Sequence, residues 1–147
     1  MRENLFKAKR IDNGEWVEGC YAECNGKTFI GIDISIGIDD IFEVFCASVI
    51  RWLEVDPETL CRFAGLCDKY GNKIWDNDIV KTVSDIYAPV KFGLYTTGFA
   101  IEECNQGFYV DFPYETCLRH ELGYWHNKVE VRGNIFDNPE LLQGSVK

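Results

Sequence analysis

The amino-acid sequence predicts a mainly β fold: a barrel or sandwich of short antiparallel strands with one or two short helices. Residues 30–38 alternate strictly between isoleucine and small or polar residues, which places all five isoleucines on one face of a strand. Asn-Gly pairs, which supply the positive φ angles of tight hairpin turns, punctuate the N-terminal part. Short apolar segments bounded by glycine recur through the rest of the chain, as they do in barrels and sandwiches.

The N-terminal part is expected to form a three-stranded meander. Asn13-Gly14 and Asn25-Gly26 each lie between two apolar segments and predict hairpin turns. The three strands are expected at 5–11, 15–23 and 27–34.

The middle of the chain is less regular. Residues 41–55, IFEVFCASVIRWLEV, are apolar without a clear helical or strand period, and one or two strands are expected there. Asp56 is a candidate N-cap with Pro57 at the first helical position, which predicts a single helical turn.

The second half repeats the pattern of short strands between turns. Residues 114–122, YETCLRHEL, are expected to form a short helix closed by Gly123. Pro139 within 137–142 predicts a C-terminal helical turn, followed by a frayed tail at 143–147. Strands are expected at 79–83, 90–95, 98–103, 107–112 and 128–135.

Length and charge narrow the class of protein. A single domain is expected over residues 1–147, because domains usually hold ~100–200 residues and no linker interrupts this chain. Lys and Arg number 15 against 24 Asp and Glu, and the net charge of −9 disfavours binding to nucleic-acid phosphates. There is no apolar run of about 18 residues and no apolar leader, so we expect a cytoplasmic protein that does not enter a membrane.

The seven cysteines are expected to be reduced and mostly buried, because their number is odd and no CxxC pair occurs. Cys20 and Cys24 lie four residues apart in a predicted strand, which separates them by ~13 Å. That distance is too long for a disulfide.

The segment GLCDKYGNKIWDNDIVK at 65–81 raises the question of a binding loop. It matches neither a calcium loop nor a phosphate-binding loop, since its glycines and acidic residues stand at the wrong positions. A structural turn fits, in which Asp68 accepts local hydrogen bonds and Gly71 takes positive φ. Asp76 and Asp78 then start a strand, and a functional carboxylate pair is the alternative interpretation. The full set of expected turn residues is Asp68, Gly71, Asn72, Asp76, Asp78, Gly133 and Asn134.

The only two histidines, His120 and His126, follow Cys117 with the spacing C-x2-H-x5-H. Cys104 could complete four zinc ligands, but the spacing matches no known zinc site, and a Cys117–His120 nucleophile pair is a further alternative. Ordinary packing is the favoured interpretation, so no metal, cofactor or catalytic residue is expected. Whether these four side chains converge in space stays open.

Aromatic residues crowd the segment 87–125. Base stacking calls for a basic groove, yet residues 87–128 hold three basic residues against five acidic ones. A core or subunit interface is therefore favoured, then a groove for a peptide or protein, and nucleic acid last. The candidate interaction surface consists of Tyr95, Phe99, Tyr109, Phe112, Tyr114, Tyr124 and Trp125.

Three segments resemble the YopX family of phage and prophage proteins. They are RENLFKAKRIDNGEWVEG at 2–19, VDPETLCRFAGLCDKYGNKIWDNDIVK at 55–81 and VEVRGNIFDNPELL at 129–142. Asp76-Asn77 departs from the Glu-Gly type pair that is more frequent in the family. The resemblance implies a mainly β fold of SH3-like barrel character and a gene on a phage, prophage or other mobile element. It implies no catalytic residues, and fold alone supplies no function.

Three classes of function follow from these observations. The favoured class is a non-enzymatic accessory protein that acts by protein–protein contact and self-associates. The second is related to nucleic acid, by direct binding through Lys7, Lys9 and Arg10 or by DNA mimicry of an acidic face. The third is an enzyme that uses the cysteine–histidine pair or the aspartate pair described above, which requires those side chains to converge in one pocket.

Overall fold

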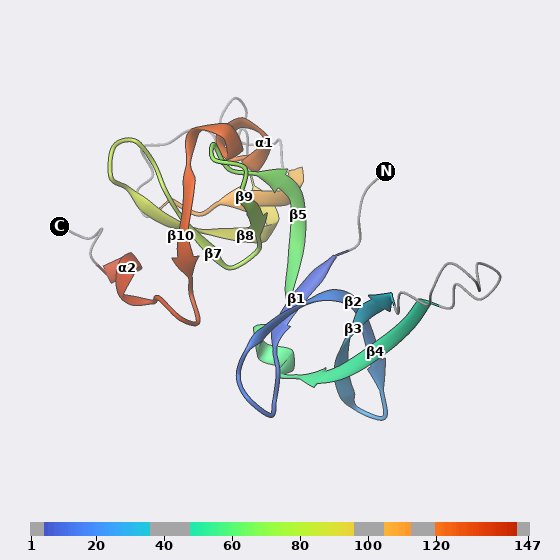
Figure 1. Cartoon of the computed structure of the whole chain (residues 1–147). Helices are drawn as coiled ribbons and strands as arrows, with labels where there is room; N and C mark the ends of the chain where they lie inside the picture. The colour runs from blue at the N-terminus through green and yellow to red at the C-terminus, as the bar shows by residue number, and fades with distance from the viewer. Residues whose placement is uncertain (1–4, 36–47, 96–104, 113–119, 144–147) are drawn as a thin grey trace. The chain divides into compact units, whose positions relative to one another are not determined.

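The computed structural model describes residues 5–35, 48–95, 105–112 and 120–143 (Figure 1). The chain divides into two compact units, with the boundary between Arg62 and Phe63. Strand β5 (Cys61–Cys67) runs through that boundary, so one strand contributes to both units. The single domain expected over 1–147 stays a prediction, because sharing a strand does not decide whether two units fold together.

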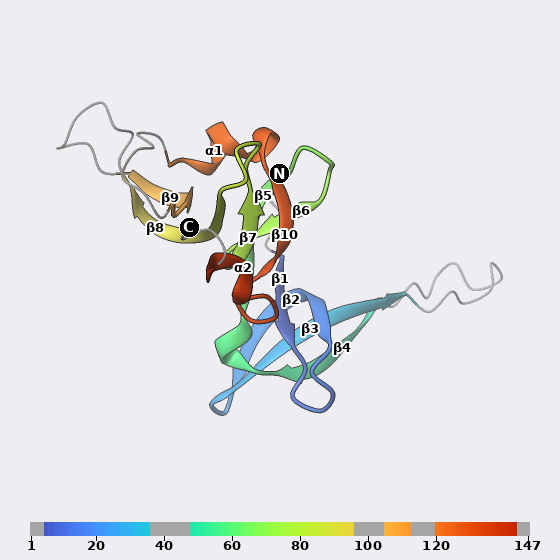
Figure 2. The same ribbon diagram turned by 90° about the vertical axis from the view of Figure 1, so that its left-hand side faces the viewer.

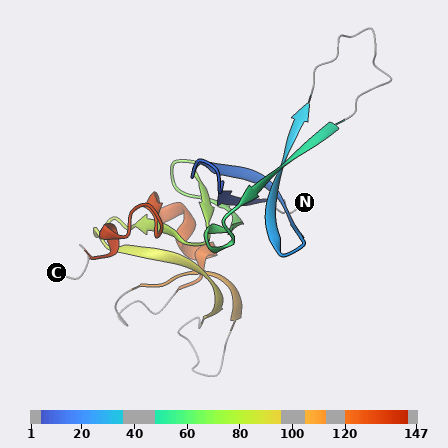
Figure 3. The ribbon, with the colours of Figure 1, turned by 90° about the horizontal axis from the view of Figure 1, so that it is seen from below.

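The first unit contains β1 (Phe6–Lys9), β2 (Trp16–Cys24), β3 (Lys27–Ser35), β4 (Ser48–Val55), the 3-10 helix η2 (Pro57–Thr59) and the start of β5. Its antiparallel strands follow the order β4-β3-β2-β1-β5. The predicted meander is confirmed as far as Ser35, because β1 pairs with β2 and β2 pairs with β3. Figure 3 shows β3 and β4 side by side as a long antiparallel pair.

The two Asn-Gly turns differ. Asn25 and Gly26 have φ values of 52° and 75°, as a two-residue turn between paired strands requires. The Asn13-Gly14 turn is longer than the tight turn expected, since the Arg10 N–H donates to the Glu15 carbonyl oxygen at 2.9 Å and closes a four-residue loop.

The core of the first unit lies on one face of its sheet. Ala8, Ile30 and Val55 are fully buried there, as the alternation in β3 predicts for Ile30. Asp56 caps η2 by accepting the Glu58 N–H at 3.0 Å, which confirms the predicted helical turn. The last two isoleucines of the alternating run lie outside the described residues.

The second unit holds the remainder of β5 and β6 (Lys73–Trp75), β7 (Asp78–Lys81), β8 (Tyr87–Tyr95), β9 (Asn105–Val110), α1 (Leu122–Trp125), the 3-10 helix η3 (His126–Lys128), β10 (Glu130–Asn134) and α2 (Glu140–Gln143) (Figure 2). Four antiparallel strands follow the order β10-β7-β8-β9, and β6 pairs with β5. The strand expected at 98–103 lies outside the described residues. The core is formed by Ile74, Val80, Ala88, Val90, Val110, Phe112, Leu122 and Val129.

The mainly β fold is confirmed, but the described strands do not form a closed barrel. Both strand orders are open, with distinct edge strands at their ends. In the first unit β1 and β4 meet only at an isolated bridge between Arg10 and Val55, rather than along a continuous ladder. The SH3-like character implied by the resemblance stays a prediction.

The predicted helices need two corrections. Helix α1 begins at Leu122 and contains Gly123, which was expected to end a helix over 114–122. The segment before it is extended: the Val110 N–H donates to the His120 carbonyl oxygen at 2.8 Å, and Glu121 bridges to Tyr109. Residues 113–119 lie outside the described residues.

At the C-terminus the predicted helical turn is confirmed as α2. This helix includes Gln143, which was assigned to the frayed tail, and residues 144–147 are outside the described part. Within the described residues, the helices are all too short or too polar to cross a membrane.

Candidate functional site

An apolar surface lies on the side of the β2-β3-β4 sheet opposite the core of the first unit. Cys20 pairs with Gly31, which in turn pairs with Trp52, and paired residues share a face of an antiparallel sheet. Ile50 and Trp52 have exposed fractions of 46% and 47%. We call this surface the outer face; its apolar and small residues are Cys20, Ala22, Cys24, Phe29, Gly31, Ile50 and Trp52, and the charged Lys27 and Glu54 lie at one end of the same face.

The outer face contains a shallow pocket of about 340 Å³, lined by Ala22, Cys24, Phe29 and Trp52. Gly31, which pairs with Trp52, leaves no room for a side chain, since an added Cβ would lie 2.8 Å from both Ile50 Cγ2 and Trp52 Cζ3. The absence of a side chain at Gly31 therefore lets the large side chains of β4 pack directly against the sheet.

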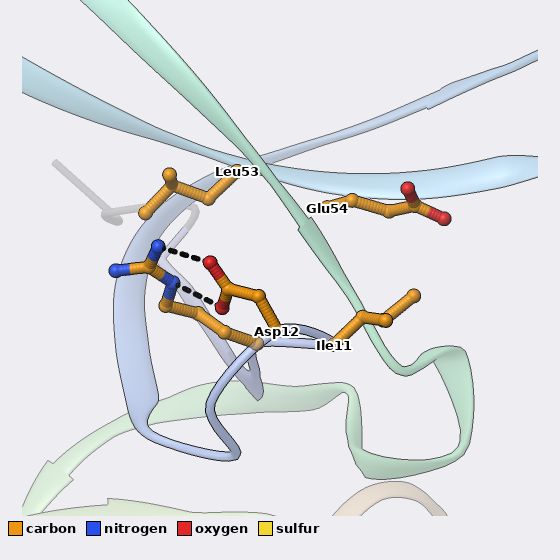
Figure 4. A pocket seen from close by; sticks show the side chains of 5 residues that line it. Ile11, Asp12, Leu53 and Glu54 are labelled. Carbon is orange, nitrogen blue, oxygen red and sulfur yellow. Dashed lines mark hydrogen bonds and ion pairs between the residues drawn. The ribbon is translucent and has the colours of Figure 1, made fainter.

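A second pocket, of about 130 Å³, lies where the end of β1 meets β4, and Figure 4 shows the side chains around it. The Arg10 guanidinium donates to both carboxylate oxygens of Asp12, at 2.9 and 2.6 Å. These hydrogen bonds lower the pKa of Asp12 below its ordinary value. The Glu54 carboxylate has Lys27 Nζ at 4.0 Å. Ile11 and Leu53 complete the lining.

In the second unit, Asp68 is buried and organises a turn. One of its carboxylate oxygens accepts the N–H groups of Tyr70 and Asn72, at 2.9 and 2.8 Å. The other accepts the Val131 N–H of β10 at 2.8 Å. Gly71 has a φ of 85°, which favours glycine. The carboxylate thus binds its own turn and a strand far along the chain.

A scan against protein-family models matches the chain to the YopX family, described as YopX protein, over residues 5–143. The chain belongs to the YopX family. The match covers nearly the whole sequence and confirms the family resemblance found from three shorter segments. A search of curated proteins finds no match.

Asp68 gives this YopX family member a predictable response to acid. Burial alone would raise the pKa of Asp68, but the N–H groups of Val131, Asn72 and Tyr70 outweigh it and lower the pKa below 3.8. Its stabilising contribution is therefore complete above about pH 4 and is lost as the pH falls through the lower folded-state pKa. We expect urea denaturation to show a larger loss of stability between pH 5 and pH 3 in the natural chain than in an Asp68→Asn variant, and equal losses would contradict this.

The Asp76/Asp78 alternative is not supported by the positions of the two residues. Asp76 lies in the turn between β6 and β7, whereas Asp78 is buried at the start of β7 and accepts the Trp75 N–H at 2.9 Å. They therefore do not share a strand face. At the second expected turn, strand β10 continues through Gly133 and Asn134, with a β-bulge between Val131 and Gly133.

Beyond the bulge, Asn134 organises the chain much as Asp68 does. Its Oδ1 accepts the N–H groups of Phe136 and Asp137, at 3.0 and 2.9 Å. Gly133 and Asn134, which were expected in a turn, are therefore the last two residues of strand β10, and residues 135–139 connect β10 to α2.

The two histidines of this family member bind backbone carbonyl groups. His120 Nδ1 donates to the Val110 oxygen at 3.0 Å, and His126 Nδ1 donates to the Cys67 oxygen at 2.9 Å. Cys104 and Cys117 lie outside the described residues, so their convergence with the histidines is untested. Among the described residues, no three His, Cys, Asp or Glu side chains gather as a metal site would need.

The predicted aromatic surface separates into different environments. Phe112 belongs to the core, with its ring centroid 5.1 Å from that of Trp125, so its assignment to a surface is wrong. Tyr124 stacks edge-on against Trp125 at 5.2 Å. Tyr95 and Tyr109 lie together across β8 and β9, with centroids 5.9 Å apart. Phe99 and Tyr114 lie outside the described residues.

The prediction of mostly buried cysteines is wrong for most of the cysteines that the structure describes. Of the four cysteines in the described residues, only Cys61 is buried, whereas Cys20, Cys24 and Cys67 are exposed. Two of the exposed cysteines form part of the outer face, which sequence reasoning missed. The alternation of Cys20, Ala22 and Cys24 along β2 was a signal for such a face, because small apolar side chains recur there with period two.

Proposed function

We propose that this protein is a non-enzymatic accessory protein, encoded by a phage or prophage, that acts by binding another protein through its outer face. The observation that carries the proposal is the clustering of half-exposed Trp52 and Ile50 beside an apolar pocket of about 340 Å³. Contiguous apolar surface with a large aromatic side chain is typical of protein-binding sites. The partner is a different protein or a second copy of the chain.

The polar groups that were considered for catalysis support a non-enzymatic role. Of these groups, the Asp78 carboxylate accepts the Trp75 N–H, and His120 hydrogen-bonds to the Val110 carbonyl group through Nδ1. Such contacts stabilise turns and strand ends. The proposal keeps the cytoplasmic location expected from the sequence, where exposed thiols such as Cys20 and Cys24 stay reduced.

We expect a Trp52→Ala variant to capture at least about tenfold less partner than the natural chain, because a central aromatic residue often dominates binding. The measurement is affinity capture of the tagged protein from a bacterial host lysate treated with nuclease, quantified by mass spectrometry. Tyr70→Ala is the matched control, since Tyr70 is 67% exposed but lies in the second unit. Equal capture by the Trp52→Ala variant and the natural chain would overturn the proposal.

A role related to nucleic acid is the second candidate, because two lysines flank an aromatic ring on β1 and β2. Lys7 Nζ and Lys9 Nζ lie 4.9 and 5.5 Å from the ring centroid of Trp16. Against it, Arg10 is already bound to Asp12, and the net charge is −9. Capture that disappears with nuclease, together with salt-dependent binding reduced by replacing Lys7 and Lys9 with glutamine, would favour this role.

A further inference from the structure

Strand β4 is the edge strand of the sheet in the first unit. At its C-terminal end the edge is covered, since the Ile11 N–H donates to the Glu54 carbonyl oxygen at 3.1 Å and the Asp56 N–H donates to the Lys9 carbonyl oxygen at 2.8 Å. These bonds point away from β3. Because backbone direction alternates along a strand, the N–H and C=O groups of every even-numbered residue of β4 point toward this edge.

The same alternation turns the backbone groups of Ile50 and Trp52 toward the edge, where no described residue pairs with them. The side chains of these two residues are the exposed apolar groups of the outer face. Natural edge strands are usually protected by charged side chains, proline or bulges. Strand β4 has two charged residues: Arg51, on the face opposite Ile50 and Trp52, and Glu54, at the end where the edge is covered.

We propose that the edge of β4 binds an extended segment of a partner protein as an added strand, and that this segment carries a lysine or arginine beside Glu54. The inference rests on the proposed function and names the chemistry of the partner. Backbone hydrogen bonds to Ile50 and Trp52 supply affinity, while alternate side chains of the segment pack on the outer face, as in other cases of strand addition.

We infer the lysine or arginine of the partner segment from the position at which the open edge of β4 ends. Pairing stops at Ile11, so the next residue of the added strand reaches the pocket that contains Asp12 and Glu54 (Figure 4). Asp12 is already bound there by the Arg10 guanidinium, so the carboxylate that an incoming cation meets is that of Glu54, whose side chain is 38% exposed and which has Lys27 Nζ at 4.0 Å. A cation there meets complementary charge, and a net charge of −9 attracts a basic segment over longer distances.

The same charges favour a partner segment over a second copy of this chain. Two copies would each bring −9, which opposes their association. An antiparallel pair of β4 strands centred on Arg51 would also place two guanidinium groups directly opposite each other, which is destabilising.

The test begins with selection of short random peptides, displayed in a library, on the full-length protein. We expect the enriched peptides to alternate apolar and polar residues and to end in lysine or arginine. A synthetic copy of one such peptide should bind the Trp52→Ala variant at least about tenfold more weakly and the Glu54→Gln variant about threefold more weakly. The matched control is Arg51→Ala, which should bind normally because that side chain lies on the other face.

Hydrogen exchange and backbone methylation test strand addition itself. The amides of Ile50 and Trp52 should exchange slowly only when the peptide is bound. N-methylation of alternate peptide residues should abolish binding in one register and leave it nearly unchanged in the other, because successive N–H groups point to opposite sides of a strand.

Each remaining outcome overturns the inference. The inference is wrong if the enriched peptides lack alternation or a terminal cation. It is also wrong if the amides of Ile50 and Trp52 stay unprotected with the peptide bound, or if dimerisation alone protects them. These results leave the proposed function intact if capture from lysate still depends on Trp52. Conversely, the Trp52→Ala variant could capture as much partner from lysate as the natural chain while the peptide still protects the amides of the edge. That result would contradict the proposed function of the outer face but support the edge of β4 as a peptide-binding site.

Discussion

Replacing Asp68 by asparagine is expected to lower the free energy of unfolding of the second unit by about 3 kcal/mol, because charge-assisted hydrogen bonds in a buried site are lost. Asp68 accepts three backbone N–H groups, at 2.8–2.9 Å, from Tyr70, Asn72 and Val131. Asparagine replaces one carboxylate oxygen with an NH2 group, which cannot accept and meets an N–H donor. At least one buried donor is then left without a partner.

The measurement is chemical denaturation at neutral pH, with hydrogen exchange to show where stability is lost. The Val131 amide should lose protection together with the turn at 68–72, since one carboxylate holds both. Asp111→Asn is the matched control because Asp111 is exposed, and it should change stability by less than about 0.5 kcal/mol. Similar stability of the two variants would show that the Asp68 hydrogen bonds contribute little.

The sequence predicted the turn at Asp68 but not its connection to β10. Local turn chemistry can be read from Asp68 and Gly71, because both act within a few residues. The hydrogen bond to Val131 joins residues 63 positions apart, and no local pattern specifies such a partner. The same limit explains why the strands were predicted while the choice between a barrel and a sandwich was left open. Alternation predicts which face of a strand is buried, but not which strands end as edges.

The outer face escaped prediction because β4 is apolar on both faces. Leu53 and Val55 point into the core of the first unit, while Ile50 and Trp52 are exposed on the opposite face. A strand with apolar residues on both faces shows no period of two, which is why residues 41–55 lacked a clear pattern. For the aromatic cluster the error was the opposite one: Phe112 was assigned to a surface but is buried. Composition does not distinguish a buried ring from an exposed one.

Replacing Gly19 by alanine is expected to destabilise the first unit by about 3 kcal/mol, at the upper end of the usual cost of overpacking. An added Cβ would lie 2.0 Å from the Gly31 carbonyl oxygen and 3.1 Å from Ile30 Cγ2. The nearest atom belongs to the backbone of β3, so no side-chain rotation relieves the contact. The strands must move apart where β2 passes from its pairing with β1 to its pairing with β3.

Alanine variants at two further glycines are controls that distinguish this backbone clash from the general effect of adding a methyl group. At Gly123 in α1, no heavy atom outside its chain neighbours and the backbone of its own helix lies within 4 Å of the added Cβ, so Gly123→Ala should be neutral or stabilising by up to about 1 kcal/mol. At Gly31 the obstructing atoms are side chains, so Gly31→Ala should leave the protein folded while displacing Trp52 from the outer face. Denaturation and tryptophan fluorescence distinguish the three variants. If Gly19→Ala proves as stable as Gly123→Ala, the close approach of β2 to β3 is not needed for the fold. If Gly31→Ala also abolishes peptide binding while remaining folded, the arrangement of Trp52 on the outer face, and not only its presence, determines recognition.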